Sequence, residues 1–508
     1  MKKIIGFLIC LLLIAVAVPA AMSQNYDGIT KSVVCSSLSN TLVDWNEMQK
    51  LLAVDGGADD HFGESVSVDG DTAIIGVPQD DDLGSSSGSV YVFIYDGNNW
   101  IQQAKLHASD GVAGDNFGYS VSLCGDTALI GAIGYDDYYG SAYVFTRSGT
   151  TWTQQAKLIA SDGASMDYFG KSVSADGDTA LIGAAYDDNY KGSAYVFIRL
   201  GTTWTQQAKL VASDGNVEDY FGRSVSVDGD TALIGAQGND NSKGAAYMFT
   251  RSGSTWIQKI KLLASDGEEI DCFGCSVSLN GDTASIGALG DDIKGSAYVF
   301  TYTGSSWTQQ AKLVASDGAS LDGFGNCVSV DGDTALIGAF GCDDKGEDSG
   351  SAYIFTRTGS TWIQQSKLIA SDGFAEDEFG VCVSVDGNFA FIGAYYDDDM
   401  GTSSGSAYVF ARPGLDFEIK GGLGVNIKIT NYGMLKSTVF NWEIHAEGGI
   451  LGMIDKSVNG SVDIPVGESK TVGTGLFFGF GSITVSAKVA DVEKTEDGMQ
   501  FIIFSKVK

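Results

Sequence analysis

Between residues 62 and 380 seven copies of the dipeptide Phe-Gly stand at nearly constant spacing, and no other feature restricts the fold of this chain as strongly. The spacings between successive copies are 55, 52, 52, 52, 51 and 55 residues. The copies begin at Phe62, Phe117, Phe169, Phe221, Phe273, Phe324 and Phe379. A repeat of this length is one supersecondary unit that buries its apolar surface against its neighbours. The sequence therefore predicts a repeat architecture.

Each unit contains four short apolar runs, which we name strands A to D. Typical copies read Phe-Gly-x-Ser-Val-Ser-Val, Asp-Thr-Ala-Leu-Ile-Gly-Ala, Gly-Ser-Ala-Tyr-Val-Phe and Thr-Trp-Thr-Gln-Gln-Ala-Lys-Leu. β-branched and aromatic residues fill the runs, while Gly, Asp and Ser fill the gaps. An Asp-Gly pair between strands A and B suits a tight type I′ hairpin turn. Four antiparallel strands repeated in this way, with no helical period between them, predict the blades of a β-propeller.

The phase of the repeat predicts how the ring closes. The last A-B-C set runs from Phe379 to Phe410 and has no D strand after it. A spare D strand, Trp45–Leu51, stands instead before the first Phe-Gly pair. Seven A-B-C sets and seven D strands make seven blades only if the N-terminal strand completes the last one, which also removes two open sheet edges. We therefore predict an all-β protein, with a seven-bladed β-propeller closed by an N-terminal strand.

The Phe-Gly pair and the Ile-Gly-Ala of strand B together resemble the FG-GAP repeat. The second motif stands at Ile130–Ala132, Ile182–Ala184 and Ile337–Ala339, and the resemblance covers residues 42–412. It implies the seven-bladed propeller of integrin α subunits and of many prokaryotic exported proteins, and a role in adhesion or partner binding. It does not specify a ligand. The integrin calcium loop between strands A and B is replaced here by a tight turn, so no residue inherits that site.

The segments on either side of the propeller have other signatures. Lys2 and Lys3 precede an apolar run and a stretch of small residues, so we predict a signal peptide over residues 1–23 and a secreted or cell-surface protein. Residues 24–41 are expected to form a flexible lead-in. After Pro413 the chain changes to other alternating runs, and residues 413–508 predict a small C-terminal β-sandwich of immunoglobulin-like kind.

The charge of the chain restricts its partners. Acidic residues outnumber basic ones by 64 to 31, which gives a net charge of −33. Nucleic acids and anionic membranes attract basic proteins, so neither is expected as a partner. No segment after the signal peptide is long and apolar enough to cross a membrane. We expect a monomeric propeller that binds an extracellular protein or glycan.

The acidic residues concentrate in two kinds of loop, the B–C turns and the D–A links that join successive blades. In a four-stranded blade these loops lie on the same face of the disc, which we call the loop face. Every D–A link contains the pattern Asp-Gly-x-x-x-Asp, and most B–C turns carry an Asp pair. The candidate metal ligands in the B–C loops are Asp81, Asp137, Asp188, Asp292, Asp344 and Asp398. Further candidates for ligand contact are Asp80, Asp82, Asp343, Asp348, Asp397 and Asp399, which lie in the three longest B–C loops.

Two interpretations of these carboxylates stay open. Ca²⁺ takes six to eight oxygen ligands, and clustered carboxylates with loop carbonyls supply them. Alternatively, Asp side chains cap turns by accepting backbone hydrogen bonds, and the surplus charge keeps the protein soluble. Sevenfold repetition of the Asp-Gly-x-x-x-Asp pattern favours the second interpretation, because a specific site normally breaks the symmetry.

The leading functional prediction is a non-enzymatic binding or adhesion protein. One alternative is a secreted enzyme that acts on polysaccharide with paired carboxylates of the loop face. Another is a purely structural component of the cell envelope. The three histidines form no catalytic or zinc motif. Cys327 and Cys382 replace the same Ser in adjacent blades, either as a pair near the channel or as small buried side chains.

Overall fold

The computed structural model describes residues 45–134, 138–412, 414–420, 425–431, 439–448, 454–465, 469–474, 479–489, 492–502 and 504–507. The predicted signal peptide and lead-in lie outside these residues. The chain divides into two compact units, one of residues 42–416 with 431–436 and one that contains residues 417–430 and 437–508.

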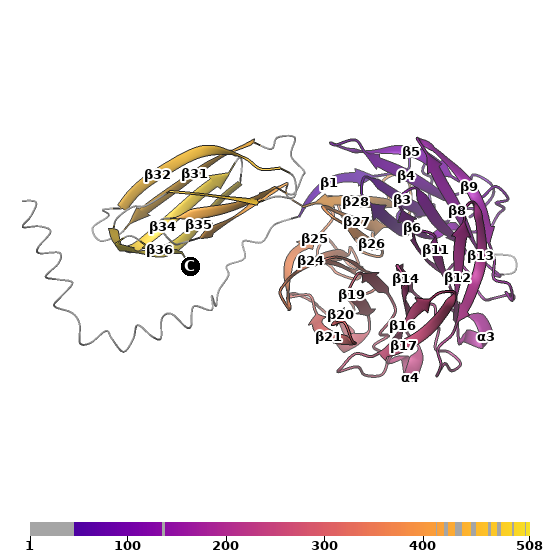
Figure 1. The fold of residues 1–508 in the computed structure, drawn as a ribbon. Coiled ribbons are helices and arrows are strands. Elements are labelled where there is room, and N and C mark those ends of the chain that lie inside the picture. Colours follow the sequence, from indigo (N-terminus) through magenta and orange to yellow (C-terminus); the bar gives the residue numbers. More distant parts are fainter. Residues whose placement is uncertain are drawn as a thin grey trace, which may run out of the picture. The chain divides into compact units, whose positions relative to one another are not determined.

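Within the described residues the first unit consists of seven four-stranded antiparallel sheets, arranged as blades around a ring (Figure 1). Blade 1 consists of β2 (Ser65–Asp69), β3 (Thr72–Val77), β4 (Ser89–Tyr95) and β5 (Trp100–Leu106). Blade 2 consists of β6 (Phe117–Cys124), β7 (Thr127–Ala132), β8 (Ser141–Ser148) and β9 (Thr151–Leu158). Blade 3 consists of β10 (Ser172–Asp176), β11 (Thr179–Ala184), β12 (Ser193–Leu200) and β13 (Thr203–Leu210). Blade 4 consists of β14 (Val225–Asp228), β15 (Thr231–Ala236), β16 (Ala245–Ser252) and β17 (Thr255–Leu262). Blade 5 consists of β18 (Val277–Asn280), β19 (Thr283–Ala288), β20 (Ser296–Tyr302) and β21 (Trp307–Leu313). Blade 6 consists of β22 (Val328–Asp331), β23 (Thr334–Ala339), β24 (Ser351–Thr358) and β25 (Thr361–Leu368). Blade 7 is β26 (Val383–Asp386), β27 (Phe389–Ala394), β28 (Ser406–Ala411) and β1 (Asn46–Leu51).

The sequence of each strand matches its place in the blade. All six residues of β11, a strand B, are buried, as expected for an apolar run that is covered on both faces. Strand D is the outer edge, and every side chain of β13 except the last is exposed or half-buried. Its polar Thr-Gln-Gln-Ala-Lys run suits an edge strand that must not pair with other chains.

The A–B hairpin turn differs from the expected type. In β10 and β11, Asp176 pairs with Thr179, so the two central residues are Gly177 and Asp178. Gly177 has a φ of 55°, while Asp178 is not among the residues with positive φ. Positive φ at the first central residue alone is the pattern of a type II′ turn. The expected type I′ turn with Asp-Gly at its centre is therefore wrong, because the pairing register lies one residue further along.

Both ends of the propeller sequence meet in blade 7. β1 pairs antiparallel with β28, with Lys50 opposite Tyr408 and Leu51 opposite Ala407. Phe62 of blade 1 forms a parallel bridge with Gly405 of blade 7, as Phe169 does with Gly140 between blades 2 and 3. The contact between the last and first blades is thus of the same kind as the others.

Apolar packing between the blades follows the same ring. One buried cluster combines Phe62, Tyr91 and Trp100 of blade 1 with Phe391 and Val409 of blade 7. Similar clusters join the other neighbouring blades. Burial of this kind is the main source of stability for a repeat protein, because each repeat alone leaves one apolar face uncovered.

In the second unit the described strands form a three-stranded and a five-stranded sheet. The first contains β29 (Leu415–Lys420), β30 (Asn426–Asn431) and β33 (Ser469–Gly473), and the second contains β32 (Ile454–Asp463), β31 (Val439–Gly448), β34 (Gly479–Val489), β35 (Val492–Ile502) and β36 (Phe504–Val507). Apolar residues on one face of each sheet are buried, such as Ile427 and Ile429 in β30 and Ile444 and Ala446 in β31. The immunoglobulin-like sandwich stays a prediction.

Candidate functional site

The lysine of strand D lies among the carboxylates of the loop face. In blade 3 the Nζ atom of Lys209 is 2.7 Å from Asp162 of the D–A link and 2.6 Å from Asp187 of the B–C loop. The hydroxyl of Tyr195, which pairs with Lys209 across the strands, donates a hydrogen bond to Asp162 at 3.1 Å. The equivalent lysines each contact the first Asp of a D–A link, and they are Lys50, Lys105, Lys157, Lys261, Lys312 and Lys367. We call this arrangement the lysine–aspartate cluster.

The second Asp of each D–A link closes a turn. In blade 3 the Asp167 carboxylate accepts a 2.6 Å hydrogen bond from the backbone N–H of Ala164, three residues earlier. The same bond is made by Asp60, Asp115, Asp219, Asp271, Asp322 and Asp377. Both aspartates of the repeated pattern therefore have a structural part, as the turn interpretation requires.

Two predicted metal ligands also accept backbone hydrogen bonds inside their own loops. Asp81 accepts the N–H of Ser86, and Asp398 accepts the N–H of Ser403, both at 2.7 Å. These loops are the longest ones of blades 1 and 7, and the bonds hold them in the same shape. The carboxylates are accessible, but each already satisfies one donor of its loop.

The other predicted metal ligands lie on separate blades. Asp188 and Asp292 are 3.3 Å from Lys191 and 3.8 Å from Lys312, respectively. Asp344 is 2.5 Å from the Nζ atom of Lys367. Asp137 lies outside the described residues. The six candidates come from six different loops, so they would form separate sites and not one shared site.

The predicted ligand-contact residues cluster within single loops. Asp80 and Asp82 are 2.7 and 2.6 Å from the Nζ atom of Lys105, and His107 is 2.9 Å from Asp82. Asp80, Asp82 and His107 are close enough together to hold a metal ion. The Lys105 ammonium already contacts both carboxylates, so this set of ligands is better suited to a lysine than to a second cation.

The long loops of blades 6 and 7 contain the remaining predicted contact residues. Asp397 and Asp399 are 2.8 and 2.6 Å from the Nζ atom of Lys50. Asp343 accepts the backbone N–H of Asp348 at 3.0 Å. Lysine side chains of the propeller itself therefore neutralise part of the negative charge of the loop face.

Large apolar side chains stand exposed beside these carboxylates. Ile270, Leu321 and Phe374, in three successive D–A links, are 71%, 74% and 74% exposed. Val112, Met166 and Val217 are also exposed in the links before blades 2, 3 and 4. Ile270 has a φ of 76° and Leu321 one of 74°, which is unfavourable for residues with a Cβ atom. We call these six side chains the apolar rim.

Sequence reasoning missed both the lysines and the apolar rim. The lysines had a visible signal, because the run Gln-Ala-Lys-Leu ends most D strands. The apolar rim has a weaker signal, since its six members are spread over three positions in links that otherwise repeat.

The basic residues of the opposite face are also paired. In blade 3, Arg199 contacts Asp178 of the A–B turn at 2.7 Å and donates to Thr127 of blade 2 at 3.1 Å. Arg147, Arg251 and Arg357 make the equivalent contacts. These arginines therefore connect blades.

The six described cysteines are free thiols. The sulfur of Cys327 accepts the N–H of Val383 in the next blade at 3.3 Å, and Cys382 accepts that of Val66 at 3.4 Å. These contacts fit the interpretation of the two cysteines as small interior side chains.

A family model described as FG-GAP repeat matches seven segments, residues 45–93, 100–145, 152–197, 204–249, 256–300, 307–355 and 362–410. The chain belongs to the FG-GAP repeat family. Each FG-GAP unit begins with a D strand and ends with a C strand, so its D strand joins the blade of the unit before it. For the first unit, that blade is the last one. A search of curated proteins gave no significant match to the chain. In the part of the chain that is described, no helix is long and apolar enough to cross a membrane.

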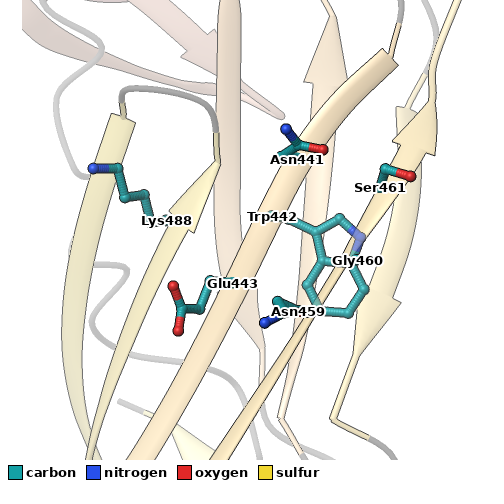
Figure 2. A pocket seen from close by; sticks show the side chains of 7 residues that line it. All are labelled: Asn441, Trp442, Glu443, Asn459, Gly460, Ser461 and Lys488. Atoms are coloured by element: carbon teal, nitrogen blue, oxygen red, sulfur yellow. The ribbon is translucent and has the colours of Figure 1, made fainter.

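The second unit holds a separate polar groove of about 460 Å³ on β31 and its neighbours. Its lining residues are Asn441, Trp442, Glu443, Asn459, Gly460, Ser461 and Lys488. Figure 2 shows the Trp442 indole lying over Gly460, where a larger residue would collide with the ring. The buried indole N–H of Trp442 has no hydrogen-bond partner among the described residues. None of the predicted site residues lies in this groove.

Proposed function

We propose that the chain is an exported, non-enzymatic binding protein whose loop face engages an extracellular partner. The observation that carries this proposal is the apolar rim. Monomeric proteins seldom expose several large apolar side chains together unless the surface binds something. The positive φ of Ile270 and Leu321 belongs to the turn that all the links share, since Asp59 and Glu218 have it too, so the argument rests on the exposed side chains.

The character of the loop face favours a protein partner over a glycan. Apolar anchors surrounded by fixed polar groups are typical of protein interfaces. The lysine–aspartate clusters keep the carboxylates in place, so little side-chain conformational freedom is lost on binding. A glycan partner for the loop face is the second candidate from the sequence, and it lacks a comparable observation in its favour.

Calcium binding by the B–C loops stays a prediction. A site for Ca²⁺ needs several carboxylates that lack other counter-ions. Lysine ammonium groups lie within hydrogen-bonding distance of Asp80, Asp344 and Asp397, and this supports binding without Ca²⁺. The enzyme and envelope-component alternatives are likewise untested.

The experiment is a binding screen of the full chain against extracellular proteins and glycans, with two single variants in parallel. Leu321→Asp disrupts the apolar rim, whereas Leu200→Asp changes an 86% exposed side chain at a C–D turn of the opposite face. We expect the Leu321→Asp variant to bind the partner with a Kd that is at least about tenfold higher than that of the wild type. The Leu200→Asp variant should bind with unchanged affinity. The opposite pattern would contradict the proposal.

A further inference from the structure

One position of the repeat holds a different residue in every blade, although the residue before it is always Gly. It is the second residue after the Phe of each Phe-Gly pair, and the seven residues there are Glu64, Tyr119, Lys171, Arg223, Cys275, Asn326 and Val381. The Gly before this position and the Val two residues after it are constant. The strand A segments of neighbouring blades contact one another around the centre of the ring. This variable position therefore gives the central axis a different side chain from each blade.

Four of these side chains act on one another. The Nζ atom of Lys171 is 3.0 Å from the hydroxyl of Tyr119 and 4.8 Å from the centre of its ring. The charges of Arg223 and Glu64, from blades 4 and 1, both act on Lys171 in blade 3. Side chains from these separate blades can interact in this way only if they face one another near the axis. We call Glu64, Tyr119, Lys171, Arg223 and the adjacent Tyr186 the axial cluster.

Lys171 and Arg223 differ from the repeated cations of the propeller. The strand D lysines and the strand C arginines each have an Asp within 4.0 Å. Among the described residues, neither Lys171 nor Arg223 makes an ion pair, and the guanidinium of Arg223 has no hydrogen-bond partner. Both side chains are half-buried. A guanidinium presents five N–H donors, so this pair is a set of charged donors without an anionic acceptor.

Tyrosine rings extend the axial cluster toward the loop face. Lys171 lies 5.7 Å from the ring centre of Tyr186, and Tyr186 contacts Tyr168 and Tyr220 with ring centroids 4.8 and 5.6 Å apart. Tyr190 completes the group, 5.5 Å from Tyr186. Aromatic rings of this kind present flat apolar faces together with hydroxyl groups.

We propose that the axial cluster binds the carboxylate of a sugar acid, a site separate from the apolar rim and independent of the function proposed for it. Lys171 and Arg223 hold the carboxylate, and the rings of Tyr119 and Tyr186 pack against the sugar. A single carboxylate fits better than a phosphate, a sulfate cluster or a polyanion, because Glu64 and the net charge of −33 oppose a higher negative charge. The adjacent tyrosines favour a sugar over an aliphatic acid.

The state of Lys171 gives the site a pH dependence. It is faced by Tyr119 and Tyr186, by Arg223, and by the charge of Glu64. Burial, with a further contribution from Arg223, lowers the pKa of Lys171 to about 8. The affinity for a sugar acid is therefore expected to fall as the pH rises from 7 to 9, over which the ligand carboxylate keeps its charge.

The test is calorimetric titration of the full chain at pH 7 with D-glucuronate, and with methyl glucoside and acetate as probes of the two halves of the ligand. The variants are Lys171→Gln and Arg223→Gln, with Lys259→Gln on an exposed strand position as the control for net charge. We expect glucuronate to bind, and each axial variant to weaken it by at least about tenfold. The Lys259→Gln control should bind glucuronate as tightly as the wild type does. Methyl glucoside, the neutral sugar, should not bind. Thermal unfolding of each variant establishes that it is folded.

Several outcomes would overturn the proposal. Absence of glucuronate binding to the wild type, or equal weakening by all three variants, would exclude the axial site. Equally tight binding of acetate would remove the sugar from the proposal, and equally tight binding of methyl glucoside would remove the carboxylate. In Lys171→Arg the charge is kept across pH 7 to 9, so binding that still weakens over this range would contradict the part assigned to Lys171.

Discussion

The ammonium of Lys50 lies 2.8 Å from the Asp397 carboxylate, although 347 residues separate them in the sequence. Lys50 belongs to β1, the strand that completes blade 7, and Asp397 lies in the B–C loop of the same blade. In blade 3 the same contact joins Lys209 and Asp187 within one repeat. The lysine–aspartate cluster thus operates across the closure of the ring just as it does inside the other blades.

Removal of the Lys50 ammonium should destabilise the closed ring. The Asp397 side chain is 5% exposed, so a Lys50→Met variant would leave its carboxylate buried without its main counter-ion. Breaking a buried pair from one side costs about 3–5 kcal/mol. Lys157→Met is the matched control, because its partner Asp110 is 50% exposed and the expected loss is below about 1 kcal/mol. Urea unfolding measures the free energy of unfolding of both variants. Equal losses of stability would show that the Lys50 contact has no special importance for closure of the ring.

The two aspartates of the D–A link before blade 7 should respond oppositely to pH. Burial raises the pKa of Asp377 to about 6, against the effect of its hydrogen bond from Phe374. Burial also acts to raise the pKa of Asp372, but hydrogen bonds from Lys50 and Tyr408 outweigh it and the pKa is lowered. A raised pKa means that the folded state binds more protons, so this contribution to stability falls as the pH rises from about 4 to 6.

Asp377→Asn should therefore stabilise the protein at pH 7, by up to about 3 kcal/mol, because an amide keeps the hydrogen bond from Phe374 without a buried charge. The gain should disappear near pH 4, where the wild-type carboxyl group is protonated in the folded state. Denaturant unfolding at pH 4, 5, 6 and 7 checks this. A gain that does not depend on pH would show that charge is not its cause.

Lys171 offers a prediction of the opposite kind. Its pKa is lowered from 10.5 to about 8, chiefly by burial. Below pH 8 both the folded and the unfolded states carry the charge, and the folded state bears the full cost of burying it. Between pH 8 and 10.5 the unfolded state binds more protons, so the stability of the wild type rises with pH. Lys171→Met should be more stable than the wild type at pH 7, by up to about 3 kcal/mol, and this advantage should shrink steadily toward pH 10.

Calcium should have little specific effect if lysines are the counter-ions of the loop face. We expect the thermal midpoint of residues 24–508 to be the same in EDTA and in millimolar Ca²⁺ at fixed ionic strength. A filled calcium site would instead raise the free energy of unfolding by about 2.7 kcal/mol when the Ca²⁺ concentration is a hundredfold above Kd. A rise in Ca²⁺ that is absent in Mg²⁺, and that Asp81→Ala, Asp344→Ala or Asp398→Ala removes, would establish the calcium site.

The repeats determined most of what the sequence could predict. The constant Phe-Gly spacing predicted seven blades, and the position of Trp45–Leu51 predicted the strand that pairs with β28. Both follow from backbone geometry that every repeat shares. The hairpin turn was predicted wrongly because an Asp-Gly pair indicates a turn without fixing which residues are central, and the register here places Gly177 first.

The contacts of the site were harder to predict for a physical reason. Lys50 and Asp397 interact because the ring closes, and composition alone shows only an excess of carboxylates. The apolar rim depends on loop conformations that expose Ile270 and Leu321, whereas an apolar residue is ordinarily expected in the core. Lys171 and Arg223 stand at a visibly variable position, but their proximity to Glu64 follows only from the closed ring.

The measurement that tests the central claim most directly is hydroxyl-radical footprinting of the full chain, with and without the partner obtained from the binding screen. Binding through the loop face predicts protection of Met166, Leu321 and Phe374, and unchanged reactivity of Leu200, which is exposed on the opposite face. Protection of Leu200 with the apolar rim still fully reactive would contradict the assignment of the loop face as the binding surface.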